Sequence, residues 1–367
     1  MPRNRTIYNV LSLYAGQVTG SATGQHTGVG SIRQLTRVQS FDEDFSRNFT
    51  DVNQYGNLAA IDRIEVEAPT VSSSFSYYPT DGSNERYLGL TVTTGTQTLT
   101  SCLSGLLNKT TDEKNYFLLI ADEGNDAVGY NAGAGGRSGV IGVGNAYITS
   151  YSVDGAVGDI PTVSVDLEAL NVRVYANATG TTNPIPAINP INGFPVTSSF
   201  FSLPNSVTND SASQVTALQP GDITLNIDGL TGVSVSDLKV QSFSLAFDLG
   251  RTPLQRLGNR FAFSREIDFP VEATLSVEAI LGDLQDGNLA DMICQTGTVD
   301  CSVIMRRPAC GALGTPALAY VLRGAKVASQ AVSTSIGDNA TFTAEYQVQI
   351  GGPQDLARGV FISGTYV

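Results

Sequence analysis

The residues that could carry out chemistry in this chain are few. Its one histidine, His26, lies in a stretch rich in Gly, Ser and Thr, where a histidine is more often a solvated loop residue than a catalyst. Neither a G-x-S-x-G nucleophile motif nor a phosphate-binding loop occurs. The glycines at 139, 142 and 144 superficially resemble a dinucleotide loop, but a strand-forming sequence follows them instead of a helix. The sequence therefore predicts a protein that is not an enzyme, with no cofactor.

Three acidic clusters could offer oxygen ligands to calcium. They are Asp42-Glu43-Asp44, Asp122-Glu123-Gly124-Asn125-Asp126 and Asp283-Leu284-Gln285-Asp286. None has the full spacing of a known calcium-binding loop, so a solvated face is the favoured interpretation and no metal site is predicted.

The cysteines match no zinc pattern either. They are Cys102, Cys294, Cys301 and Cys310. Cys294 and Cys301 could close a small loop in an oxidising setting, while free thiols in core or loop are the favoured alternative.

The sequence contains an internal repeat. Val38-Gln39-Ser40-Phe41 recurs as Val240-Gln241-Ser242-Phe243, at an offset of 202. Matches continue to the end of each copy, where the offset falls to 179, so the first copy carries about twenty extra residues, which we place at 108–139. Because the matches include Gly and Pro positions that fix backbone geometry, we interpret the chain as two copies of one domain. The residues that define the repeat are Phe41, Gly56, Pro69, Gly158 and Asp159 in the first copy, and Phe243, Gly258, Pro270, Gly337 and Asp338 in the second.

The expected organisation has five segments. They are an N-terminal arm (1–37), a first β domain (38–172), a connector rich in Pro, Asn and Thr (173–239), a second β domain (240–350) and a C-terminal tail (351–367). The arm holds too much Gly, Ser and Thr to form a core, so it is expected to be mobile or ordered by a neighbour. Deleting residues 1–30 should then leave a folded protein that does not polymerise. Within the connector, alternation at 223–227 favours a strand.

The composition favours strands over helices in both copies. Hydrophobic residues make up 41% of the chain and charged residues 15%, with abundant Gly, Thr, Ser and Val. Alternation predicts strands at 61–66, 70–78, 146–153 and 162–170, with counterparts in the second copy. A short helix is predicted at 97–107, with a partner at 284–293. The expected fold is mainly β, with two tandem antiparallel sandwich or barrel domains, each with a short flanking helix.

Charge and hydropathy exclude several classes of partner. The formal net charge is −13, which disfavours a groove that holds nucleic acid through its phosphates. No apolar run approaches the ~20 residues of a membrane span. The N-terminus, with Arg3 and Arg5, makes a poor signal peptide.

Several of these segments resemble the tail tube proteins of long-tailed bacteriophages. They are Arg37-Val38-Gln39-Ser40-Phe41 and the residues at 51–56, 69 and 74–78 in the first copy, and those at 261–265, 269–277 and 337–341 in the second. The resemblance covers about two thirds of the chain. It implies a sandwich with a flanking helix and a long hairpin loop, whose sheets join into rings that stack into a hollow tube for DNA.

The resemblance also implies partners and a location. The chain would contact itself and other tail proteins, let DNA pass without binding it, and belong to a virion tail assembled in the host cytoplasm. Two domains per chain would let three chains close one pseudo-sixfold ring, with a hexameric ring as the alternative. Asp42, Glu43 and Asp44 are candidate lumen or interface residues, because their counterparts Ser244, Leu245 and Ala246 carry no charge.

Other functions remain open at this point. A head–tail connector or a capsid decoration protein would form a single ring or a cap and would not polymerise. A carbohydrate-binding or adhesin module usually displays exposed aromatic side chains, and the absence of tryptophan argues against it.

Overall fold

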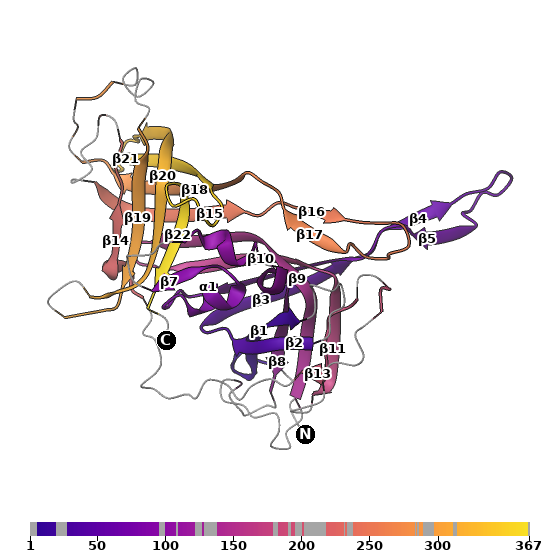
Figure 1. Cartoon of the computed structure of the whole chain (residues 1–367). Helices are drawn as coiled ribbons and strands as arrows, with labels where there is room; N and C mark the ends of the chain where they lie inside the picture. The colour runs from indigo at the N-terminus through magenta and orange to yellow at the C-terminus, as the bar shows by residue number, and fades with distance from the viewer. Residues whose placement is uncertain are drawn as a thin grey trace.

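The computed structural model shows a chain built almost entirely of antiparallel strands (Figure 1). It describes residues 6–19, 28–94, 100–107, 109–121, 127, 138–178, 183–189, 192–194, 200–201, 218–230, 232, 238–282, 284, 286–288, 297–310 and 314–365. The prediction of a β-rich fold is confirmed.

The elements follow one another along the chain with few helices between the strands. The strands of the N-terminal half are β1 (Leu11–Thr19), β2 (Gly28–Gln34), β3 (Val38–Ser46), β4 (Phe49–Val52), β5 (Asp62–Glu65), β6 (Thr70–Tyr77), β7 (Val92–Thr94), β8 (Lys114–Ile120), β9 (Ser138–Ala156), β10 (Thr162–Ala169) and β11 (Asn171–Ala178). Those that follow are β12 (Asn183–Pro184), β13 (Phe200–Phe201), β14 (Ile223–Asn226), β15 (Lys239–Asp248), β16 (Arg251–Leu254), β17 (Ser264–Ile267), β18 (Val271–Ile280), β19 (Val299–Arg306), β20 (Pro316–Ser333), β21 (Thr341–Ile350) and β22 (Gly359–Gly364). The helices are α1 (Ser83–Leu88) and α2 (Lys109–Asp112), with 3-10 turns η1 (Tyr8–Val10), η3 (Cys102–Gly105) and η4 (Pro220–Asp222).

One eight-stranded sheet runs through both halves of the chain. Its order is β20-β21-β18-β15-β9-β10-β6-β3, so β9 and β15 join the two halves edge to edge. The strands alternate buried and exposed side chains, as β18 does with Val271, Ala273 and Leu275 facing the core. This period of two buries one face of the sheet and leaves the other for polar residues.

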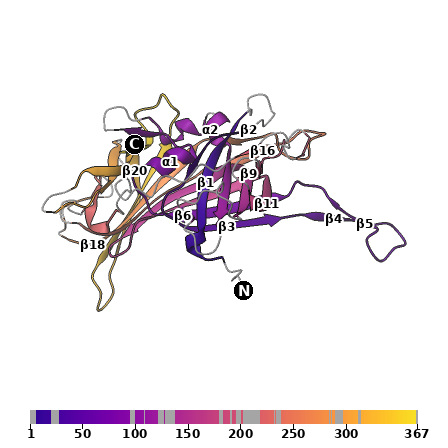
Figure 2. The same ribbon diagram turned by 90° about the horizontal axis from the view of Figure 1, so that it is seen from below.

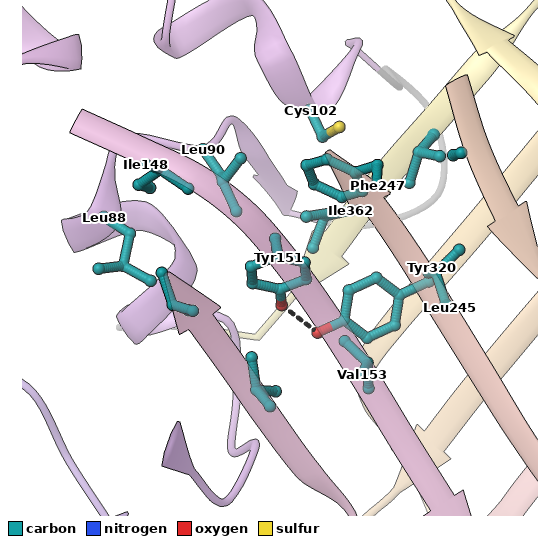
Figure 3. Close-up of a cluster of buried hydrophobic side chains, with 14 of the residues drawn as sticks. Leu88, Leu90, Cys102, Ile148, Tyr151, Val153, Leu245, Phe247, Tyr320 and Ile362 are labelled. Carbon is teal, nitrogen blue, oxygen red and sulfur yellow. Dashed lines mark hydrogen bonds between the residues drawn. The ribbon is translucent and has the colours of Figure 1, made fainter. Parts of the chain in front are cut away.

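The long strands β9 and β20 each leave this sheet and continue into a second layer. The first part of β9 pairs with β8 and β11, and β8 pairs in turn with β1. The first part of β20 pairs with β19 and β22, and β19 pairs with β14. Buried side chains from both halves form one hydrophobic cluster, which includes Tyr151, Phe247 and Tyr320 (Figure 3).

The two halves follow one scheme of strand pairing. The strands correspond as β1 to β14 (offset 212), β3–β6 to β15–β18 (202), β8 to β19 (185), β9 and β10 to β20 and β21 (179), and β11 to β22 (188). Register shifts also coincide, between Val38 and Ser40 and between Val240 and Ser242. We call residues 11–178 the N-terminal unit and residues 223–364 the C-terminal unit.

This pairing corrects the expected arm and tail. Residues of the expected arm form β1 and β2, and β1 pairs with β8 and buries Leu13 and Ala15 in the core of its own chain. The expected tail forms β22, which pairs with β20 and runs parallel to β7. Both segments pair with strands that are distant in sequence. A local count of Gly and Ser cannot detect such pairing.

The extra residues and the helix also differ from expectation. The offset falls from 202 at Tyr77 to 185 at Lys114 and only then to 179 at Gly139, so most of the extra residues precede β8 instead of lying at 108–139. The interval between β6 and β8 also holds α1, which was not predicted, whereas the helix predicted at 97–107 gives only the 3-10 turn η3 among its described residues. Most of its predicted partner at 284–293 lies outside the described residues.

Hairpins project from the same end of both units. The β4–β5 hairpin extends far from the sheet in both views, and its counterpart β16–β17 projects toward the same side of the molecule (Figures 1 and 2). Gly56 and Gly258, with φ of +91° and +90°, occupy equivalent turns at their tips, where an L side chain would be strained.

Candidate assembly interface and polar sheet face

The exposed face of the eight-stranded sheet is polar across its full width. Directly paired residues share a face, and the registers place on this one Ser40, Asp42, Asp44, Ser72, Ser74, Ser76, Ser150, Ser152, Asp154, Ser164, Asp166, Glu168, Ser242, Ser244, Asp248, Glu272, Thr274, Ser276, Glu278, Ser329, Ser333, Thr343, Glu345, Gln347 and Gln349, with Lys326 at one edge. We call this surface the polar face. Its carboxylates far outnumber its cations, so it repels a polyanion.

Short hydroxyl side chains hold several of these carboxylates in place. Ser150 Oγ donates a hydrogen bond of 2.6 Å to Asp166 Oδ2, and Ser242 Oγ donates one of 3.2 Å to Glu278 Oε2. Ser329 Oγ donates to Glu345 Oε2 in the same way. These cross-strand pairs keep a surface of small side chains and fixed negative charge.

The eight-stranded sheet ends in two open edges. Within the described residues, no strand pairs with the outer edge of β3, or with residues 326–333 of β20 on the side away from β21. Phe45 is 61% exposed on β3 and Val332 is 52% exposed on β20. Such edges carry unpaired N–H and C=O groups that can add a further strand.

The joint between β9 and β15 shows how two such edges pair in this chain. Leu249 N–H donates to the carbonyl of Thr149 at 2.7 Å, and Val157 N–H donates to that of Gln241 at 2.8 Å. On the core side, Phe243, Leu245 and Phe247 of β15 are buried. The joint is therefore a continuous ladder over a shared core.

A buried arginine fixes the β16–β17 hairpin to the N-terminal unit beside this joint. The side chain of Arg251 is 1% exposed and donates to Asp112 at 2.6 and 2.8 Å. It also donates to the carbonyl of Ile148, and its guanidinium lies 5.1 Å from the ring centroid of Tyr147. Burial raises the pKa of Asp112, and the adjacent guanidinium opposes that shift. The nearby Arg265 forms an ion pair with Glu168.

The structure separates the three acidic candidates. Asp42 and Asp44 lie on the polar face, paired with Ser74 and Ser72. Glu43 pairs with Ser73 and points to the opposite face of β3, where its counterpart Leu245 is buried. An inward charge on an edge strand discourages indiscriminate pairing with other sheets.

The remaining predicted residues have structural positions. Gly158 and Gly337 take φ of +91° and +101° in matching turns, and Asp159 and Asp338 donate their backbone N–H groups within those turns. Phe243 is buried at the joint, whereas its counterpart Phe41 is half-buried at the open edge. Pro69 and Pro270 precede β6 and β18.

Sequence inspection missed the joint and its anchor. Tyr147, Asp112 and Arg251 come from distant segments, and no spacing pattern in the sequence links them. The repeat held one signal that Arg251 has a role specific to the second unit. Arg265 has a counterpart at Arg63, whereas the position of Arg251 is occupied by Phe49 in the first unit.

Few other groups could support chemistry. His26, Cys294 and the acidic cluster at 122–126 lie outside the described residues. Cys102 and Cys301 are free and buried, and Cys310 is free and exposed. Within the part of the chain that the structure describes, no group of three or more His, Cys, Asp or Glu residues is disposed to hold a metal ion. In the same part, no helix has the length and apolar character of a membrane span.

The chain is weakly similar to a solved phage tail structure. The SPP1 tail tube, determined by solid-state NMR and cryo-EM, matches at 12% sequence identity and a TM-score of 0.29, over 48% of this chain and 81% of that one. No protein-family model and no curated protein matches the chain.

Proposed function

We propose that this chain is a virion structural protein that assembles into stacked rings, which form the hollow tail tube of a long-tailed bacteriophage and deliver its DNA. The observation that carries the proposal is the eight-stranded sheet with two open edges and one acidic face. Copies joined edge to edge would close into a ring, and the polar face would line a channel that repels DNA.

We also infer that the two units are tandem copies produced by internal duplication. Their shared strand order, coincident register shifts and matching turn glycines support this. Each chain then supplies two segments of the wall, and three chains close one pseudo-sixfold ring. A ring of six chains would contradict this stoichiometry.

Proline substitution on the open edge tests the function. Along β15, the backbone groups of Gln241 and Leu249 point toward β9, and those of Leu245 do so by alternation. The counterpart of Leu245 is Glu43, whose N–H therefore points outward. Proline at 43 removes that donor and adds bulk at the edge without breaking a bond to β6.

The expected results separate the proposed function from its rivals. Electron microscopy of the purified wild type should show tubes, and Glu43→Pro should remain folded but give no rings. Glu43→Ala, which removes the carboxylate side chain but keeps the backbone N–H, should still assemble. Single rings that never stack would favour a connector, and monomers under all conditions would overturn the proposal.

A further inference from the structure

We propose that a second copy of this chain pairs its β20 edge with β3 in the register that β9 and β15 use, and that Lys326 of the second copy packs on Phe49. This inference rests on the proposed function and names the contact that closes the ring. The β9–β15 joint supplies its geometry, since β3 and β20 are the counterparts of β15 and β9.

The register follows from the two offsets. In the internal joint Ala246 pairs with Ser152 and Ser244 pairs with Asp154. The residue numbers of β15 less 202 give those of β3, and the residue numbers of β9 plus 179 give those of β20. The same register therefore pairs Asp44 with Ala331 of the second copy, and Asp42 with Ser333 of the second copy. Both pairs lie on the polar face, which therefore continues across the contact.

Exposure at the open edges marks the surface that this contact would cover. Phe45 is 61% exposed, while its counterpart Phe247 is 2% exposed within the internal joint. Val332 is 52% exposed, while its counterpart Val153 is 0% exposed. Burial of these side chains by the second copy would contribute about 25 cal/mol for each Å² of apolar surface removed from water.

At the base of the hairpins, the cation and the ring exchange sides. The internal joint sets the guanidinium of Arg251 over Tyr147. The counterpart of Arg251 is Phe49, and that of Tyr147 is Lys326. The contact between chains therefore retains a cation on an aromatic ring, with the partners reversed.

Charges around Phe49 suit a lysine from outside. Glu65 is the direct cross-strand partner of Phe49, and its carboxylate accepts hydrogen bonds from Arg47 at 3.0 and 3.1 Å. Asp51 pairs with Arg63 at 2.8 Å. Arg47 and Arg63 already lie 5.0 and 5.7 Å from the ring centroid of Phe49. Each is paired with a carboxylate, which limits its repulsion of an ammonium group that packs on the rest of the ring.

The exchange also selects the correct pairing of edges. If β15 of one chain paired with β20 of another, Arg251 would face Lys326, and two cations would meet. If β3 paired with β9, Phe49 would face Tyr147 and Asp112 would lose its guanidinium. Each mismatched joint leaves either a contact between like charges or a half-buried carboxylate without its guanidinium. These wrong pairings of sheet edges are therefore disfavoured.

A swap of the two residues tests the contact. The measured quantity is the critical concentration for assembly, by sedimentation at fixed ionic strength. Phe49→Ala and Lys326→Ala should each raise it about tenfold, as expected for a partly desolvated cation–π pair. The double variant Phe49→Arg with Lys326→Tyr reproduces the cation–ring pair of the internal joint and should recover most of that loss.

Controls separate this inference from the function on which it rests. Tyr8→Ala removes another exposed ring and Lys239→Ala another exposed cation, and neither should change assembly. If the wild type assembles but the Phe49 and Lys326 variants match it, or the double variant shows only the summed losses, the inference is wrong and the function stands. Failure of the wild type to assemble would overturn the function itself.

Discussion

The hydroxyl groups of Tyr151 and Tyr320 lie 2.7 Å apart in a shared hydrogen bond and link the two units through the core (Figure 3). Glu85 of α1 accepts hydrogen bonds from Tyr151 at 3.2 Å, Tyr320 at 3.5 Å and Tyr77 at 2.9 Å. All four side chains are buried. A polar network of this kind fixes the relative position of the elements it joins, because each buried group loses its partner if they separate.

Removing one hydroxyl should weaken this link measurably. Tyr320→Phe keeps the ring and deletes the hydrogen bonds to Tyr151 and Glu85, so the free energy of unfolding should fall by about 1 kcal/mol. Tyr8→Phe, at an exposed position, is the matched control. Urea denaturation checks both, and equal midpoints for Tyr320→Phe and the wild type would show that the network contributes nothing.

The internal joint should tolerate no side chain at Gly155. A Cβ atom there would clash with Cε1 of Phe243, so the ring must move. Gly155→Ala should cost about 1–3 kcal/mol through overpacking. Gly221→Ala is the control, since nothing lies within 4 Å of its Cβ position. A thermal midpoint unchanged by Gly155→Ala would contradict the packing described for the joint.

Stability should fall as pH rises past the acid range because of Glu113. Burial raises the pKa of this carboxyl from 4.5 to about 7, although Asn145 Nδ2 donates to its Oε1 at 2.5 Å. The folded state therefore binds the proton more tightly, and stability present below pH 4.5 is lost as pH rises through about 7. Glu113→Gln retains the acceptor and should flatten this dependence in urea titrations, whereas exposed Glu43→Gln should not. A parallel pH dependence in Glu113→Gln and wild type would refute the assignment.

The N-terminal segment should behave as core, not as an arm. Leu13 is 1% exposed in β1, so Leu13→Ala should cost about 2–5 kcal/mol. Deletion of residues 1–30 should then unfold or severely destabilise the chain, contrary to the sequence-based expectation of a folded, non-polymerising product. A truncated chain with a wild-type unfolding transition by circular dichroism would restore the arm interpretation.

Local patterns predicted the strands well. The alternation at 70–78 and 162–170 became β6 and β10, and the short pattern at 223–227 became β14. These segments carry their own period-two signal, because one face of each is buried and the other faces water.

Pairing between distant segments was harder to predict. The partners of β1 and β22 lie in β8, β20 and β7, and no local feature identifies them. The helix α1 did have a local signal, since the Asp81 carboxylate accepts the Ser83 N–H at 3.1 Å at its start. The role of Arg251 is visible only in the three-dimensional structure, because its carboxylate partner Asp112 is distant in sequence.

Cysteine cross-linking in register tests the central claim most directly. On a Cys310→Ser background, which removes the free thiol that is exposed in the described part of the chain, Asp44→Cys with Ala331→Cys places two thiols directly opposite across the proposed contact, about 4.5–5.5 Å apart at Cβ. Asp44→Cys with Ser333→Cys is the control one step out of register, at about 7–8 Å.

Mild oxidation of assembled protein, followed by denaturing electrophoresis, is the measurement. The proposed contact between β3 and β20 predicts covalent oligomers that end at the trimer for the in-register pair, and little cross-linking for the control. Equal cross-linking of the two pairs, or none in assembled rings, would contradict it.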